Sequence, residues 1–159
     1  MTLLLVVLLP FLGALGVAWD SRLGRSSAIL LSFLVVMASV ILILSLLDPL
    51  VAGETHVESW RWLPSVGLVL AFRLDGLGLL FAGLILGIGG LVILYARYYL
   101  AEQDNLGRLY AYLLLFMGTM LGVVLSENLI QMLVFWELTS LSSFLLIGYW
   151  RQREEARTG

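Results

Sequence analysis

Glu137 is the residue whose position is hardest to explain by a purely structural role. It lies about ten residues from either end of an apolar run, 128–149, that is long enough to cross a membrane. A carboxylate at the centre of a bilayer costs about 2.5–3.5 kcal/mol. The eleven Leu, Ile, Val and Phe residues from Leu129 to Ile147 contribute about 3–7 kcal/mol in favour of insertion. The run therefore still inserts, but the acid removes much of its margin.

A helical arrangement of this run places polar groups on two faces. The residues flanking Glu137 on its own face are Ile130, Leu133, Ser140, Leu141 and Phe144. The opposite face carries Asn128, Gln131, Thr139, Ser142 and Ser143. This pattern indicates that protein or water, with little lipid, surrounds the helix. Desolvation raises the pKa of a carboxyl and leaves it neutral, whereas a nearby cation lowers the pKa and keeps it charged. A carboxyl that is subject to both influences can take up and release a proton as its partner moves. The alternative is a neutral acid hydrogen-bonded to Ser140 or to a backbone carbonyl.

Other polar residues have simpler interpretations. Asp75 begins another apolar run, where a carboxylate either caps the helix or handles ions. Glu127 is interpreted as a solvated loop acid, and Arg73 and Arg97 as anchors at the membrane interface. His56 is the only histidine, so a proton or metal contact there would have no histidine co-ligand. We therefore expect a solvated loop histidine.

The chain is 61% hydrophobic and only 13% charged, about half the charged fraction of a soluble domain, which indicates a membrane protein. Five apolar runs must therefore position the residues above. The sequence predicts an all-α membrane protein with five transmembrane helices at 2–19, 27–47, 75–98, 108–126 and 128–149. Two β-prone segments, 55–63 and 67–74, flank Pro64-Ser65-Val66-Gly67 and predict a hairpin on the outer face between the second and third helices. Small-residue spacing at Gly83/Gly87 and Gly118/Gly122 predicts helix packing.

The charged and aromatic residues predict the orientation. With the N-terminus outside, the inner segments hold seven arginines and the outer segments only Arg61 and Arg73. All six tyrosines then fall at the inner interface, together with Trp19 and Trp150, whereas Trp60 and Trp62 lie outside. We expect a multi-pass protein of the cell membrane with its N-terminus outside and its C-terminus in the cytoplasm.

Two segments resemble a known family. Phe135–Trp150, FWELTSLSSFLLIGYW after SENL, is similar to the glutamate helix of the multisubunit cation/proton antiporters. Phe72–Leu100, after WRWLP, resembles the start of that family's conserved region. The likeness covers about 60–150. The family includes the A-type subunit of Mrp-type sodium/proton antiporters and the antiporter-like L subunit of respiratory complex I, and the sequence around Glu137 is nearer to the Mrp A-type subunit.

The resemblance implies a role for each part of the chain. It implies a larger antiporter-like bundle in which Glu137 relays protons, with Thr139, Ser140, Ser143 and Asp75 as supporting polar groups. The family's glutamate pairs with a lysine on a later helix, whereas all nine cations here are arginine, so that lysine would lie on a segment absent from this chain. We expect an N-terminal portion divided into 1–59 (two helices and the start of the hairpin), 60–126 (hairpin and helices three and four) and 127–159 (helix five and a cytoplasmic tail).

The expected partners are other subunits of a membrane antiporter complex, the lipid bilayer, and Na⁺ and H⁺ as transported ions, with no nucleic acid. The absence of cysteine excludes thiolate metal sites and disulfides, and we expect no cofactor. No nucleophile–base pair or phosphate loop is present, so a transporter subunit is expected rather than an enzyme. Two alternatives are a proton-pumping subunit of NADH:quinone oxidoreductase, which would be a translocase subunit, and a non-transporting assembly subunit.

Overall fold

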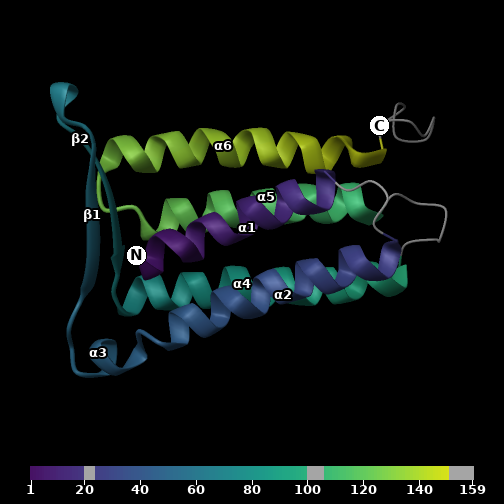
Figure 1. Ribbon diagram of the computed structural model, residues 1–159, viewed down its shortest axis with the longest axis horizontal. Coiled ribbons are helices and arrows are strands. Elements are labelled where there is room, and N and C mark those ends of the chain that lie inside the picture. Colours follow the sequence, from purple (N-terminus) through teal and green to yellow (C-terminus); the bar gives the residue numbers. More distant parts are fainter. Residues whose placement is uncertain (20–23, 100–105, 151–159) are drawn as a thin grey trace.

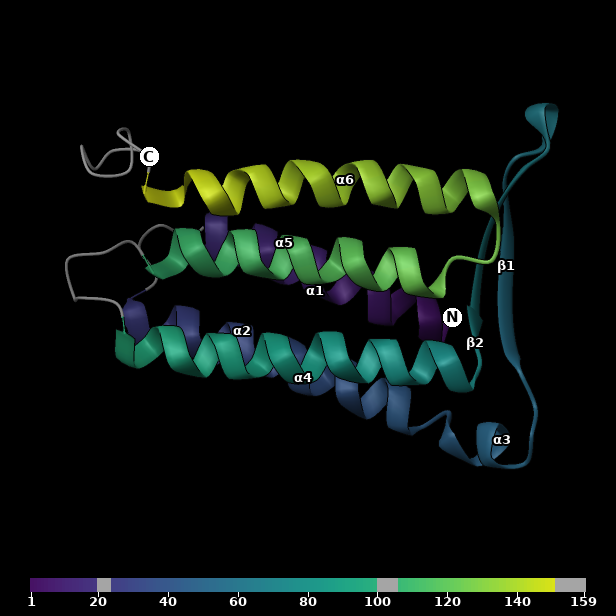
Figure 2. The same cartoon turned by 180° about the vertical axis from the view of Figure 1, so that it is seen from behind.

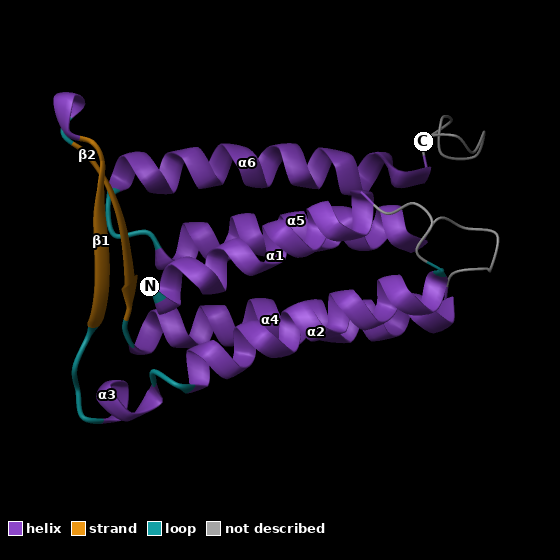
Figure 3. Ribbon diagram, viewed as in Figure 1, coloured by secondary structure: helices purple, strands orange, loops and turns teal. Residues whose placement is uncertain are grey.

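Figure 1 shows the computed structural model of the chain, which describes residues 1–19, 24–99 and 106–150. Its five long helices lie side by side, and each is long and apolar enough to cross a membrane. They are α1 (Thr2–Trp19), α2 (Arg25–Leu44), α4 (Gly76–Tyr99), α5 (Leu106–Leu125) and α6 (Leu129–Ile147). A two-stranded hairpin crosses one end of the bundle (Figure 3). The expected fold is thus confirmed.

The hairpin consists of β1 (His56–Leu63) and β2 (Leu68–Leu74), which pair antiparallel with His56 opposite Leu74. A 3₁₀ turn at Pro64–Val66 joins them, and Gly67 follows with a positive φ of 72°, a conformation that favours glycine. The turn lies where the Pro-Ser-Val-Gly sequence predicts it. The hairpin also brings buried Phe72 against Trp60 across the strands, with ring centroids 6.5 Å apart.

Helix α5 is the centre of the bundle and packs against α1, α2, α4 and α6. Seen from behind, it lies between α6 and α4 (Figure 2). Side chains at helical spacing form its buried stripe: Tyr110, Leu114, Met117, Leu121 and Leu125. Small residues on α5 then allow its neighbours to approach closely.

The two glycine pairs that share the same spacing, on α5 and on α4, differ in their contacts with neighbouring helices. A Cβ on Gly118 would meet the ring of Phe11 on α1 at 2.9 Å, and one on Gly122 would collide with the ring of Phe135 on α6. These two glycines therefore serve helix packing as predicted. Gly83 and Gly87 pack against no neighbour within the described part of the chain, because a Cβ on either would meet nothing within 4 Å there. They lie on the exposed face of α4.

The second helix is shorter than expected, since α2 ends at Leu44 and a separate short helix, α3 (Leu47–Val51), follows. The Ser45 hydroxyl donates to the carbonyl of Leu42, 2.6 Å away, at the end of α2. Pro49 lies within the first turn of α3, the part of a helix that tolerates proline. These residues break the apolar run where hydropathy alone continues it.

The two ends of the bundle carry different side chains. The end crossed by β1 and β2, which we call the hairpin end, also holds the N-terminus (Figure 1). The opposite end has the tyrosines of α4 and α5 and the exposed Trp19. Tyr110 is an exception to the expected interfacial belt, because it is fully buried and donates to the carbonyl of Ile93 at 2.5 Å. The predicted orientation depends partly on Arg22, Arg151, Arg153 and Arg157, which lie outside the described residues.

Candidate functional site

Glu137 is the ninth of the nineteen residues of α6, so it lies about 12 Å along the helix axis from Leu129. Its side chain is exposed, and so are its neighbours on the same face, Leu133, Leu141 and Phe144. Within the described part of the chain, no hydrogen bond or ion pair is found for its carboxylate. The whole of this α6 face is left open by the five-helix bundle (Figure 1).

The opposite face of α6 lies against α5, its principal helical neighbour. Gln131 and Ser142 are buried there, and the ring of Phe135 fits over Gly122. The division into two faces thus follows the helical arrangement expected from the sequence. Gln131 and Ser142 on this face are covered by protein and its other polar residues are half-buried, whereas the Glu137 face has no cover among the described residues.

The structure brings three of the four expected supporting residues onto α6 with Glu137. Thr139 donates to the Phe135 carbonyl at 2.9 Å, and Ser140 donates to the Trp136 carbonyl at 3.5 Å, so both hydroxyls bond within their own helix. Ser143 is half-buried on α6. The alternative of a hydrogen bond from Glu137 to Ser140 is not found among the described contacts.

Asp75 lies elsewhere, at the start of α4 on the hairpin end. Its carboxylate accepts from the backbone N–H of Gly78 at 2.8 Å and lies 3.7 Å from the Arg73 guanidinium. This is the geometry of a helix cap. The structure therefore favours the capping interpretation and separates Asp75 from the mid-helix position of Glu137.

A group of polar side chains fastens α6 to the hairpin, a contact that was not expected from the sequence. We call Ser126, Asn128 and Gln131 the clasp. The Asn128 amide donates to the Val69 carbonyl at 2.6 Å and accepts from the backbone N–H of Gln131 at 2.7 Å, which caps α6. The Gln131 amide accepts from the Ala71 N–H at 2.8 Å and donates to the Ser126 hydroxyl at 3.1 Å. Asparagine before an apolar helix is a known cap signal, but its bond to β2 has no local signature.

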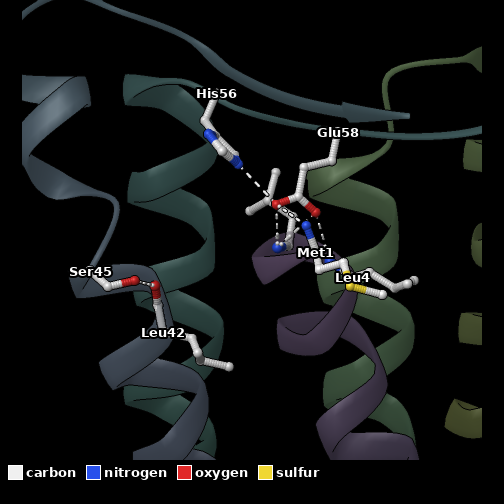
Figure 4. Close-up of polar contacts among 7 residues, drawn as sticks. Met1, Leu4, Leu42, Ser45, His56 and Glu58 are labelled. Carbon is white, nitrogen blue, oxygen red and sulfur yellow. Dashed lines mark hydrogen bonds and ion pairs between the residues drawn. The ribbon is translucent and has the colours of Figure 1, made fainter. Parts of the chain in front are cut away.

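A second missed group surrounds Glu58, which is only 9% exposed. Its carboxylate lies 3.0 Å from the N-terminal amine of Met1 and 2.9 Å from His56 Nε2, and it accepts from the backbone N–H of Leu3 at 3.2 Å (Figure 4). The weaker contact from Leu4 N is 3.4 Å long. The expectation of a solvated loop histidine was wrong, because His56 is half-buried on β1 beside this carboxylate.

The surroundings of Glu58 act on its pKa in opposite directions. Burial by itself raises the pKa, but hydrogen bonds from His56, the N-terminal amine and the Leu3 amide, with the charge of that amine, lower it. The balance holds the pKa of Glu58 below its ordinary value of 4.5. Glu58 is thus a charged cap on α1 supplied by the hairpin. His56 and Glu58 do not form a metal site with a third ligand among the described residues.

Two family models match the chain. Residues 60–110 match "NADH-Ubiquinone oxidoreductase (complex I), chain 5 N-terminus", and residues 126–159 match "NADH:quinone oxidoreductase/Mrp antiporter, TM". The chain is 52% identical over 119 residues to the A1 subunit of the Na⁺/H⁺ antiporter of Staphylococcus aureus. That match covers 75% of this chain and 15% of the relative, so the chain spans only a small part of the curated relatives' length.

Solved structures show the same relationship. The structure of the Mrp complex from Dietzia sp. DQ12-45-1b matches with a TM-score of 0.75 and 32% identity, covering 92% of this chain and 16% of that chain. The archaeal membrane-bound sulfane sulfur reductase matches with a TM-score of 0.77 and 20% identity, covering 92% of this chain and 23% of that chain, and this likeness concerns the fold alone. Together, these matches show that the chain belongs to the family that Mrp antiporters share with complex I, and that its sequence is of the Mrp A-type.

Proposed function

We propose that this chain supplies Glu137 as a proton-relay carboxyl in a multisubunit Na⁺/H⁺ antiporter of the cell membrane. The observation that carries the proposal is the position of this acid, halfway along a membrane-length helix and on the face that the described bundle leaves open. A carboxylate facing hydrocarbon is costly, so further protein or water must cover it in the membrane. The relatives are several times longer than this chain and have polypeptide to provide that cover.

The proposed partner of Glu137 is a lysine-bearing helix from outside this sequence. A lysine ammonium near the open face of α6 would compensate the carboxylate, and its movement would let Glu137 bind and release a proton. This chain has no lysine, so it cannot supply that cation. The hydroxyls of Thr139, Ser140 and Ser143 lie on the same helix and are proposed as supporting polar groups around the relay. Asp75 is proposed to contribute by holding the start of α4.

The proposal includes the surroundings of the chain. Other antiporter subunits are the proposed partners, and the hairpin end is proposed to face the outside, with the C-terminus in the cytoplasm. The Dietzia structure, titled as an Mrp complex, supports a multisubunit assembly. The matched relative from S. aureus is named for a Na⁺/H⁺ antiporter, which supports Na⁺ and H⁺ as the two transported ions. A secondary transporter component, rather than an enzyme, is the resulting assignment.

Glu137→Gln tests the relay. The variant keeps the shape and hydrogen-bonding capacity of the side chain but cannot ionise, so Na⁺-driven proton movement in vesicles carrying the assembled complex should fall to background. Complex assembly should be unchanged, because the side chain is exposed and its carboxylate makes no hydrogen bond or ion pair within the described residues, and glutamine has the same shape. Glu127→Gln is the matched control, since it makes the same change in an exposed loop acid and should leave transport intact. Retained transport in Glu137→Gln would reject the relay and favour the non-transporting assembly role.

A second candidate is a proton-pumping subunit of a quinone-reducing respiratory enzyme. The observation that favours it is the match of residues 60–110 to the model named for complex I chain 5. Purification of the tagged full-length protein from its native membrane distinguishes the two. Co-purification of redox-cofactor subunits supports the respiratory enzyme, whereas co-purification of other antiporter-like subunits alone supports the antiporter.

A further inference from the structure

The clasp holds the start of α6 at two points along β2. Val69 and Ala71 are alternate residues of the strand, so their backbone groups point to the same edge, away from β1. Asn128 bonds the Val69 carbonyl and Gln131 bonds the Ala71 N–H, while the Ala71 carbonyl accepts from the backbone N–H of Glu127 at 3.1 Å. The outer edge of β2 is therefore fastened to the chain segment that begins α6.

Two attachments one turn apart determine the rotation of α6 as well as its depth. Asn128 lies just before the first residue of the helix, and Gln131 lies within its first turn. The Gln131 side chain is only 8% exposed, and both ends of its amide are bonded. Rotation of α6 about its axis would break these bonds and leave buried polar groups without partners, which is unfavourable. The clasp thus opposes both sliding and rotation.

This rotation decides where Glu137 points. Glu137 follows Gln131 by six residues, which places it about 9 Å further along the axis and about 120° away around the helix. Accordingly Gln131 is buried toward the hairpin and α5, whereas Glu137 is on the exposed face. A slip of one residue in α6 would rotate Glu137 by about 100°, toward the side that lies on α5.

We propose that Asn128 and Gln131 are positioning residues that set the depth and rotation of α6, and so direct Glu137 toward its transport partner. The proposal rests on the proposed function of Glu137. It assigns the hairpin a role in transport geometry in addition to covering the end of the bundle.

Two substitutions separate positioning from helix capping. Asn128→Asp keeps the oxygen that accepts from the Gln131 N–H and removes the donor to Val69, so α6 remains capped. Gln131→Met has a similar length and loses both side-chain bonds. Gln131→Glu is the conservative variant, because it keeps an acceptor for the Ala71 N–H. Ser39→Ala is the control, since Ser39 is a fully buried serine on α2 whose hydroxyl bonds within its own helix.

The first readout is transport by the full-length protein in its assembled complex. Asn128→Asp and Gln131→Met should lower the antiport rate about tenfold or more, since small displacements of a reacting group are costly. Gln131→Glu should have a higher antiport rate than Gln131→Met, and Ser39→Ala should have the rate of the unsubstituted protein. Equal rates in Asn128→Asp, Gln131→Met and the unsubstituted protein would overturn the proposal. A rate in Gln131→Glu as low as that in Gln131→Met would also count against it.

The second readout is independent of Glu137 activity and uses the fact that the sequence has no cysteine. Single cysteines are introduced as Leu141→Cys on the exposed face and Ser142→Cys on the buried face of α6, and N-ethylmaleimide, a small reagent that enters the apolar interior of a detergent micelle, measures their labelling rates in the solubilised full-length protein. Asn128→Asp and Gln131→Met should raise labelling at 142 relative to 141. An unchanged ratio would overturn the positioning role. A changed labelling ratio in Asn128→Asp and Gln131→Met, together with full transport by Glu137→Gln, would reject the relay role of Glu137 but keep the role of Asn128 and Gln131 in positioning α6.

Discussion

Glu58 and Glu137 show how two acids of the same apolar chain acquire different roles. Glu58 is buried at the hairpin end and satisfied by the N-terminal amine, a backbone N–H of α1 and His56. Its charge is therefore compensated within the chain. Glu137 is exposed at the middle of α6 and has no such partners among the described residues. At the scale of the residue, the first acid is a structural cap and the second is available to another polypeptide.

Glu58→Gln should destabilise the protein in a pH-dependent way. Loss of hydrogen bonds to a buried charge should lower the free energy of unfolding by about 1–3 kcal/mol at neutral pH. The pKa of Glu58 is lower in the folded than in the unfolded state, so its contribution is fully present above about 4.5 and is lost as the pH falls through the folded pKa. Denaturant unfolding in detergent, monitored by circular dichroism, should show the two proteins converging at acid pH.

The control for this experiment is Glu54→Gln, which makes the same change in an exposed acid before β1. It should change stability little at any pH. A difference between the Glu58→Gln and unsubstituted proteins that persists below the folded pKa would contradict the charged cap. Such a result would indicate that the shape of the side chain, rather than its charge, stabilises the hairpin on α1.

At the scale of the elements, Gly122 on α5 allows the ring of Phe135 on α6 to approach closely. The ring of Phe135 occupies the space beside Gly122 that a Cβ would need. Helices in lipid gain little from hydrophobic burial, so close contact of this kind makes a large share of their association. The same contact holds the buried face of α6, which leaves the Glu137 face outward.

Gly122→Ala should therefore displace α6. The added methyl group collides with the Phe135 ring, and we expect a loss of about 1–3 kcal/mol in the free energy of unfolding, measured in detergent with a chemical denaturant. Gly87→Ala makes the same chemical change on the exposed face of α4, where a Cβ meets nothing within 4 Å. It should be neutral or slightly stabilising, because alanine favours helix more than glycine does. Equal losses in the two variants would contradict the role of close packing at Gly122.

At the scale of the whole molecule, the helices alternate in direction and give the bundle two unlike ends (Figure 1). The hairpin, α3 and the N-terminus share one end, and the tyrosine-rich ends of α4 and α5 form the other. A membrane around the bundle would therefore expose the hairpin on one side only. The proposed orientation places the hairpin outside the cell.

Two serine-to-cysteine variants test this orientation. Ser65 is exposed in the hairpin turn, and Ser27 is exposed at the start of α2 at the opposite end. Because the chain has no cysteine of its own, a membrane-impermeant maleimide applied to intact cells should label only Ser65→Cys on this chain. Ser27→Cys should react after the membrane is permeabilised. The reverse pattern of labelling would show that the N-terminus is inside.

Local properties of the sequence determined the elements of this protein. Hydropathy over about 20 residues located five helices, and alternating β-prone residues around Pro64–Gly67 located the hairpin, because both signals reside in neighbouring residues. The same periodicity divided α6 into two faces. The end of α2 was missed, since Ser45 and Pro49 stop the helix within a run that remains apolar. The division of the chain at 59 and 126 stays a prediction.

Contacts between distant residues decided the rest. Gln131 meets Ala71 and Glu58 meets Leu3, pairs that are 60 and 55 residues apart in the sequence, so no local pattern predicts the clasp or the α1 cap. Gly118 and Gly122 on α5 lie against neighbouring helices, whereas Gly83 and Gly87 on α4 have the same spacing but are exposed. The packing of neighbouring helices determines which faces are covered, and the spacing does not. The sequence alone marked Glu137 as an acid in a membrane-length helix. Only the tertiary structure placed it on the open face, because α5 and β2 hold the other side of α6.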